Sequence, residues 1–268
     1  MVRSGTRREF AMVEPKYFDV SYAINPWMDP SRPVDTAKAL KQWTRLRETY
    51  VDLGHRVEMI EAVPGLPDMV FTANGGFVID GKALCSRFAF VQREPEAQVF
   101  AAWFEAAGLA VHQLQHVNEG EGDLRLVGSR LLAASPYRTA RAAHAEVASL
   151  TGREVVSLEL VDPRFYHLDT ALAVLDDNTL AYFPPAFSAE SQAVLSDLFP
   201  GAIVASDADA GVLGLNVASD GHHVVMTDAA PDLAQQFREA GFEPISVDVS
   251  EFLRAGGGVK CCTLEIRR

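Results

Sequence analysis

The chain has 268 residues, of which 48% are hydrophobic and 22% are charged, and its formal net charge is −12. These proportions are typical of a globular protein and exclude a disordered or fibrous chain. Nucleic acid and anionic membranes repel an acidic surface, so neither is an expected partner, and no apolar run approaches the roughly 18–20 residues of a membrane span.

The N-terminal run MVRSGTRREF is basic and contains no apolar segment, so it is not a secretory signal. We expect residues 1–15 to be a flexible tail and residues 16–268 to form a single domain, because no low-complexity linker divides them. The odd number of cysteines, with Cys261 next to Cys262, argues against a disulfide framework and favours the reducing cytoplasm. The sequence leaves homo-oligomers open.

Five stretches have the apolar periodicity of helices. They are residues 34–53, 94–107, 137–150, 188–199 and 231–240. Short β-type runs flank each of them, two before and one after; around the second these are MVFTAN, GFVI with KALCS, and LAVHQL. Because Asp80-Gly81 joins GFVI to KALCS, this pair is predicted to form a hairpin.

Residues with catalytic chemistry recur near the start of these units, at intervals of about 50 residues, a period typical of arrays and propellers. They are Asp68, Glu119, His167, Asn216 and Cys261. If a ββαβ unit is repeated around an axis, the strand starts meet at one end and these residues share one pocket. Alternating helices and strands are also compatible with a doubly wound parallel sheet, although the predicted hairpins argue against it.

Three glycines precede one of the adjacent cysteines, in the run GGGVKC that ends at Cys261. Glycine permits unusual backbone angles and the close approach of a ligand. A nucleophilic thiol needs nearby cations or backbone N–H dipoles that lower its pKa. The alternative is a loop before a last strand, CCTLEI, with both thiols buried as free cysteines usually are.

The run FYHLDT places His167 and Asp169 two residues apart. If the run is a strand, both side chains lie on the same face, and a general acid or base stands beside a carboxylate. A buried histidine with satisfied hydrogen bonds is the alternative.

An acidic run, NEGEGD, places Glu119, Glu121 and Asp123 between glycines. It suits a cationic ligand, although it is also compatible with a surface turn. A calcium loop needs more oxygen ligands, and the zinc templates CxxC and HExxH do not occur in the sequence. We therefore expect no metal.

Two further runs place polar side chains among apolar ones. PDMVFTANGG carries Asp68 and Asn74 on a predicted strand, or ends in an ordinary Asn-Gly turn. INPWM carries Asn25, either at the site or in a turn held by core side chains.

Together, GGGVKC, FYHLDT, NEGEGD and PDMVFTAN resemble the guanidine-modifying branch of the pentein superfamily. That branch contains arginine deiminases, dimethylarginine dimethylaminohydrolases, amidinotransferases and arginine dihydrolases. The resemblance runs from Tyr17 to Glu265. It implies an α/β fold, namely a five-bladed α/β propeller (pentein) with pseudo-five-fold ββαβ repeats, with the site on its axis and no cofactor.

The resemblance also implies roles for individual residues. Cys261 matches the nucleophile, His167 the catalytic histidine and Glu119 the active-site glutamate, with Glu121 as the other register. Substrate contacts are implied for Arg87 and Arg138 at the carboxylate of the amino acid, and for Asn25, Asp68, Asn74, Asp123 and Asp169.

Two positions distinguish the subfamilies. Methylarginine hydrolases usually carry a lysine at the position of Asp169, and both they and deiminases usually carry an aspartate at the position of Asn74. Asn74 and the run YAINPWM resemble the arginine dihydrolases. The expected reaction is hydrolysis of free L-arginine through a covalent thiouronium to ornithine, ammonia and CO2, with citrulline as intermediate.

Three alternatives remain. A dimethylarginine dimethylaminohydrolase would release methylamines and citrulline, and an amidinotransferase would pass the amidino group to an amine. A non-catalytic propeller that binds the ribosome would lack the pair Cys261 and His167.

Overall fold

The computed structural model describes residues 3–268, and its strands form five separate three-stranded sheets. In each sheet an antiparallel pair of strands is followed by a parallel pair. A helix connects the two parallel strands, as a crossover of this kind requires. The chain therefore folds as five ββαβ units and not as one doubly wound sheet.

The units follow one another along the chain. One contains β3 (Gly76–Ile79), β4 (Lys82–Cys85), α2 (Glu96–Ala106) and β5 (Ala110–Gln113). The next contains β6 (Leu124–Val127), β7 (Arg130–Ser135), α3 (Arg141–Thr151) and β8 (Val155–Glu159). The third contains β9 (Leu172–Val174), β10 (Leu180–Tyr182), α5 (Ala189–Leu198) and β11 (Ile203–Val204). The fourth contains β12 (Ala218–Ser219), β13 (His223–Thr227), α7 (Pro231–Glu239) and β14 (Glu243–Val247).

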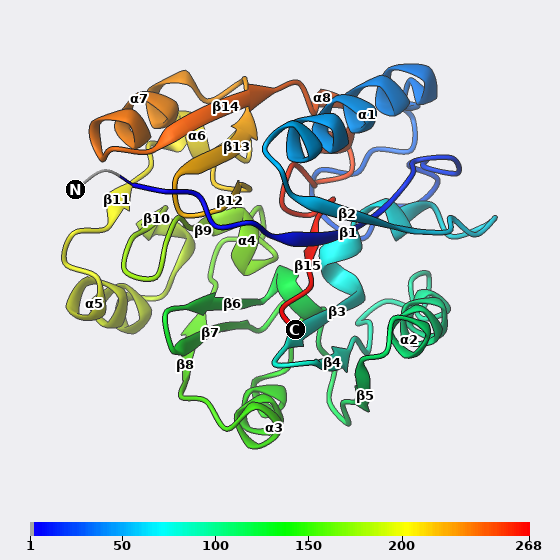
Figure 1. The fold of residues 1–268 in the computed structure, drawn as a ribbon, viewed down its shortest axis with the longest axis horizontal. Helices are drawn as coiled ribbons and strands as arrows, with labels where there is room; N and C mark the ends of the chain where they lie inside the picture. Colours follow the sequence, from blue (N-terminus) through cyan, green and yellow to red (C-terminus); the bar gives the residue numbers. More distant parts are fainter. Residues whose placement is uncertain (1–2) are drawn as a thin grey trace.

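The two ends of the chain complete the fifth unit. The last strand, β15 (Leu264–Glu265), pairs antiparallel with β1 (Glu9–Val13), and β1 pairs parallel with β2 (Arg56–Ile60) beyond α1 (Thr36–Asp52). Figure 1 shows the five sheets around the centre of the molecule, with α1, α2, α3, α5 and α7 at the periphery.

The prediction of a tail through residue 15 is wrong for β1. The run EFAMV supplies four buried residues, and the strand lies between β15 and β2. The prediction gave weight to the basic residues before this run. The apolar run itself is long enough to form the middle strand of a sheet. Loss of this strand would leave backbone N–H and C=O groups of both neighbours without their partners.

Local sequence signals account for the helices, which lie within a few residues of the predicted ranges. The side chain of Asp35 accepts a hydrogen bond from Lys38 N at 2.9 Å and so caps α1. Ala39, Trp43, Leu46 and Tyr50 follow at helical spacing and are buried. The β3–β4 hairpin also forms as predicted, with positive φ angles at Asp80 and Gly81.

Short helical turns replace three of the predicted strands. PDMVFTAN forms two 3₁₀ turns, Pro67–Val70 and Thr72–Gly75; Pro67 favours a first helical turn, where its missing N–H is not needed. The run after His167 is the one-turn helix α4 (Leu168–Ala171), and both cysteines lie in turns before β15. The other short helices are Pro184–Ala186, Gly120–Gly122, α6 (Asp207–Ala210) and α8 (Ser250–Leu253). No helix within residues 3–268 is long and apolar enough to cross a membrane.

Candidate active site

Most of the candidate residues precede the first strand of a unit, which explains why residues distant in sequence converge. Asn74 comes shortly before β3, Asp123 directly before β6 and Asn216 shortly before β12. His167 and Asp169 precede β9, and Cys261 precedes β15. Because the units share one topology, these segments meet at the same end of the five first strands, which are β3, β6, β9, β12 and β15.

Cys261 is 2% exposed and is held by two polar side chains. Its Sγ lies 3.3 Å from Asp169 Oδ2, and Asn216 Nδ2 donates to Sγ at 3.1 Å. Asn216 Oδ1 accepts from Cys261 N at 3.1 Å, so one amide fixes both the backbone and the sulfur. Asn216, which the sequence placed in the repeat without a role, is therefore part of the site.

The two adjacent thiols have different surroundings. Both cysteines belong to the apolar cluster that contains Tyr50 and Phe252, and Cys262 is fully buried. Its Sγ has no polar side-chain partner among residues 3–268. Only Cys261 therefore reaches the polar site.

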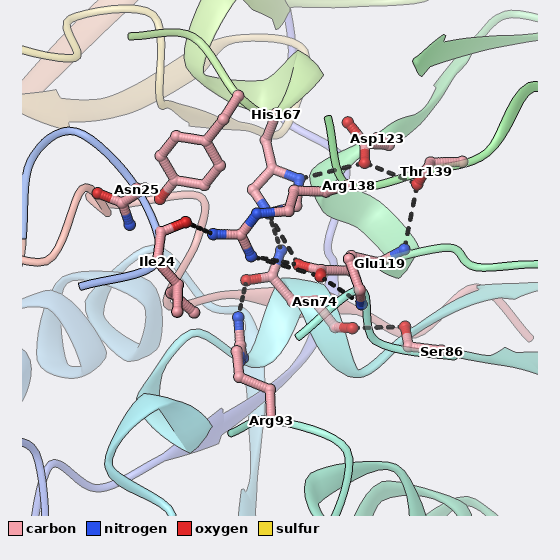
Figure 2. Close-up of polar contacts among 12 residues, drawn as sticks. Ile24, Asn25, Asn74, Ser86, Arg93, Glu119, Asp123, Arg138, Thr139 and His167 are labelled. Carbon is pink, nitrogen blue, oxygen red and sulfur yellow. Dashed lines mark hydrogen bonds and ion pairs between the residues drawn. The ribbon is translucent and has the colours of Figure 1, made fainter. Parts of the chain in front are cut away.

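Three groups surround the His167 ring (Figure 2). Nδ1 lies 3.2 Å from Asp123 Oδ2, Nε2 lies 3.2 Å from Glu119 Oε2, and Asn74 Nδ2 lies 3.4 Å from Nε2. Burial lowers the pKa of His167, but Asp123 and Glu119 outweigh that effect and raise it to about 9. His167 is thus a cationic acid at neutral pH, held by two carboxylates.

His167 and Asp169 face the site although they do not lie on a strand. His167 is extended and caps α4, whereas Asp169 lies within its first turn. The change of backbone conformation between them directs His167 to Glu119 and Asp169 to Cys261.

The structure separates the two candidate glutamates. Glu119 receives two hydrogen bonds from Arg138 Nη1, at 3.0 and 3.3 Å, and lies against His167. Burial alone raises the pKa of Glu119, but Arg138 and His167 hold it well below the usual range. Glu121 instead pairs with Lys260 and Arg267. Glu119 is therefore the ionised carboxylate beside the histidine.

Arg93, which sequence reasoning missed, fixes the orientation of the Asn74 amide. Arg93 Nη1 donates to Asn74 Oδ1 at 2.8 Å, so that Nδ2 is the end of the amide that faces His167. Glu96 binds the same guanidinium at 2.8 and 3.0 Å. The only sequence signal was the pair Arg93 and Glu96, at a spacing of three where α2 begins.

Two carboxylate oxygens in the site are buried without a hydrogen-bond partner among the described residues. They are Asp68 Oδ1 and Asp169 Oδ1, and both side chains are 1% exposed. Tyr22 donates to the other oxygen of Asp68 at 2.8 Å. Burial raises the pKa of both carboxyls. Unpaired acceptors of this kind suit a ligand rich in N–H groups.

Three predicted substrate contacts have other partners or remain exposed. Arg138 is in the site, but its Nη2 donates to Ile24 O at 2.8 Å and its Nη1 to Glu119 (Figure 2). Asn25 is half-buried and donates to Ala255 O at 3.0 Å. Arg87 is exposed, and its backbone pairs with Asn118, next to Glu119.

Glycines allow the polar groups to approach closely. A Cβ at Gly122 would lie 2.4 Å from Asn74 Nδ2 and 2.7 Å from His167 Nδ1, so no side chain fits there. Gly256 has φ +79°, and its carbonyl accepts from Tyr166 OH at 2.8 Å. The glycines therefore allow close packing around the histidine and a positive φ angle in the run before the cysteine.

None of the predicted site residues belongs to the one group of metal-type ligands found in residues 3–268, which is His222, His223 and Glu243 near the surface. The chemistry of the site is that of a thiol, an acidic imidazole and carboxylates. Such a set can attack an electrophilic carbon, protonate a leaving nitrogen and hold a cation.

Alkylation of Cys261 by iodoacetamide should be slow at neutral pH and accelerate roughly tenfold per pH unit towards pH 9, because the thiolate is the reactive form. Burial, and then Asp169, raise the pKa of Cys261 well above that of a free thiol. The rate is measured by mass spectrometry of the peptide that contains Cys261, after alkylation at pH 6 to 9. Cys261→Ser is the control. A rate that does not change between pH 6 and 8 would show that the thiol is already ionised.

No protein-family model matches the chain. The chain is 56% identical to N(G),N(G)-dimethylarginine dimethylaminohydrolase of Mycobacterium tuberculosis, over 98% of this chain and 87% of that protein. It is 36% identical to the bifunctional arginine dihydrolase/ornithine cyclodeaminase ArgZ of Synechocystis, over 95% of this chain but only 37% of that longer protein.

Solved structures of similar proteins point to the same family as these relatives. The N-terminal domain of ArgZ, an arginine dihydrolase, bound to product has a TM-score of 0.93 and 34% identity, over 97% of this chain and 98% of that domain. A cysteine-to-serine mutant of the same domain, bound to substrate, gives the same values. The chain therefore belongs to the guanidine-modifying branch of the pentein superfamily, and it is a hydrolase that acts on the guanidino C–N bonds of arginine-type substrates.

Proposed function

We propose that the enzyme is an arginine dihydrolase that converts free L-arginine to ornithine through citrulline. The observation that carries this choice is the Asn74 amide, which Arg93 holds with Nδ2 towards His167. We also propose that the five units are the blades of a five-bladed propeller, in a single domain that the pairing of β15 with β1 closes.

The guanidinium of the substrate is proposed to bind the unpaired oxygens of Asp68 and Asp169. A guanidinium offers N–H donors in a plane, and charge-assisted hydrogen bonds to carboxylates are the strong ones. Arg87 and Arg138 are proposed to bind the carboxylate of the substrate, and Asn25 to lie at the rim. Asp123 orients the histidine through its Nδ1.

A cationic substrate also assists the nucleophile. Burial raises the pKa of Cys261 most, and the charge of Asp169 raises it further. A guanidinium bound to Asp169 Oδ1 would neutralise Asp169 and place a positive charge near Sγ, and both effects favour the thiolate. The proposal is that the substrate helps to generate the nucleophile that attacks it.

The first hydrolysis then proceeds in two steps. The Cys261 thiolate attacks the guanidinium carbon, the C–N bond to one terminal nitrogen breaks, and His167 gives that nitrogen a proton so that ammonia leaves. The remaining thiouronium carbon is attacked by water that loses a proton to His167, and the C–S bond breaks to give citrulline. Glu119 stabilises the cationic form of His167 before the first step and again after water has given it a proton.

The second hydrolysis requires the site to hold a neutral ureido group. Asn74 Nδ2 can donate to its carbonyl oxygen, whereas an aspartate offers no proton. Attack by Cys261 expels a second ammonia, and water releases a carbamate that breaks down to ornithine and CO2. Overall, arginine and two waters give ornithine, CO2 and two ammonia molecules.

The second candidate is a dimethylarginine dimethylaminohydrolase, which the 56% identity to the mycobacterial protein of that name favours. Against it, a dimethylated nitrogen has no hydrogens to offer Asp169. The TM-score of 0.93 to a domain described as an arginine dihydrolase supports the first candidate.

Wild-type enzyme should release ornithine from arginine and from citrulline, and Asn74→Asp should turn over citrulline about ten to a hundred times more slowly, because an oxygen that can only accept would face the ureido carbonyl in place of the N–H donor. Citrulline should then accumulate from arginine. The measurement is amino-acid analysis of timed incubations with arginine, citrulline and dimethylarginine.

The matched control is Asn178→Asp, the same substitution at an exposed position in a hairpin; its product ratio should equal that of the wild type. Release of dimethylamine from dimethylarginine, without ornithine from arginine, would overturn the dihydrolase in favour of the second candidate. Unchanged product ratios in Asn74→Asp would remove Asn74 from the second step.

A further inference from the structure

A cavity of about 60 Å³ is lined mostly by residues in or just after the first strands of the units, whereas the main candidate active-site residues precede those strands. Residues that follow β9, the last residue of β12 and residues at the end of β15 line it. A single water needs roughly 10–15 Å³. The cavity therefore has room for a small polyatomic ligand.

Four cationic side chains line this cavity. They are Arg8, Arg125, Lys260 and Arg267. Their carboxylate partners are shared: Glu121 pairs with Lys260 and Arg267, and Glu265 pairs with Arg267 and with Arg8 at 3.2 Å. Four positive charges thus face Glu121, Glu265 and, from the guanidine site, Asp169, whose charge acts on Arg125 and Lys260.

Two further carboxylates at the rim do not compensate for this excess. Asp176 is paired with Arg3, and it accepts hydrogen bonds from the N–H groups of Asn178 and Thr179. Asp177 is exposed to solvent. The inner part of the cavity therefore keeps a positive charge.

Arg125 is the side chain whose hydrogen-bonding capacity is unused. It is 6% exposed, and its Nε and Nη1 have no hydrogen-bond partner among residues 3–268. Arg8 Nε is likewise unpartnered within that range. A buried cation with unmade hydrogen bonds is costly. In line with this, burial lowers the pKa of both Arg125 and Lys260.

We propose that this cavity is a binding site for a small oxoanion of the phosphate class, separate from the guanidine site. The N–H groups of a guanidinium match the oxygens of such an anion, and Lys260 adds a point charge. An anion bound to Arg125 and Arg8 would satisfy the unmade hydrogen bonds and balance the excess charge.

The test is binding of inorganic phosphate to the full chain, measured by isothermal titration at constant ionic strength. The wild type should bind one phosphate per chain with a saturable isotherm, and Arg125→Met should weaken binding about tenfold or more, because charged hydrogen bonds are lost. Arg8→Gln, at a half-buried position, should also weaken binding and covers the case that Arg125→Met fails to fold.

Arg56→Gln is the matched control, since Arg56 lines a neighbouring groove but not this cavity; it should bind phosphate as the wild type does. Absence of saturable binding by the wild type would overturn the proposal. Equal weakening by Arg56→Gln would also overturn it, because the anion would then bind in the groove. Neither outcome depends on which guanidine compound the enzyme hydrolyses.

Discussion

Cys261→Ser is expected to reduce turnover to less than about one thousandth of the wild-type rate, because a serine hydroxyl in this site has no base that could ionise it. Asp169 Oδ2 and Asn216 Nδ2 contact Sγ directly, and neither is a strong base. The measurement is steady-state release of ammonia from arginine by the purified variant, with a thermal unfolding midpoint to establish that it is folded.

Cys262→Ser is the matched control, because it makes the same change one residue later. Cys262 is packed among apolar side chains, so its substitution should lower stability but leave most of the turnover. The assignment is reversed if Cys262→Ser abolishes activity in a folded protein while Cys261→Ser keeps it. Mass spectrometry after a rapid quench should find the covalent adduct on Cys261 in the wild type.

The repeat could be predicted from the sequence because each unit carries its own local signals. Helical periodicity, a following glycine and the Asp80-Gly81 turn each depend on neighbouring residues alone. The pairing of β1 with β15 could not be predicted in this way. It joins residues more than two hundred positions apart, and the basic residues before Glu9 made that end look like a tail.

The site could be predicted in its residue types but not in its hydrogen bonds. His167, Asp169 and Cys261 were identified from motifs, although the strand geometry assumed for them was wrong. The reason is that a strand and a single helical turn can both bring residues from such a run to one site. Only three-dimensional contacts could reveal the role of Arg93 or separate Glu119 from Glu121.

His167→Asn is expected to lower turnover by about a hundredfold to ten-thousandfold, the usual contribution of a general acid and base. In the wild type, the pKa of His167 is about 9, so the imidazole is protonated at neutral pH and can give a proton to the departing nitrogen. As pH rises through 9 that proton is lost, so the wild-type rate should fall on the alkaline side. The measurement is the pH–rate profile of both proteins with arginine.

His144→Asn is the control for this substitution, since His144 is also buried, at 4% exposure, but binds Ser157 and Ala134 outside the site. His144→Asn should keep the wild-type pH–rate profile, even if its stability is lower. In His167→Asn, Cys261 should still react with iodoacetamide, because the thiol itself is intact. A variant that retains both the rate and the alkaline limb would show that another group transfers the proton, and Glu119, 3.2 Å from His167 Nε2, would be the next to replace.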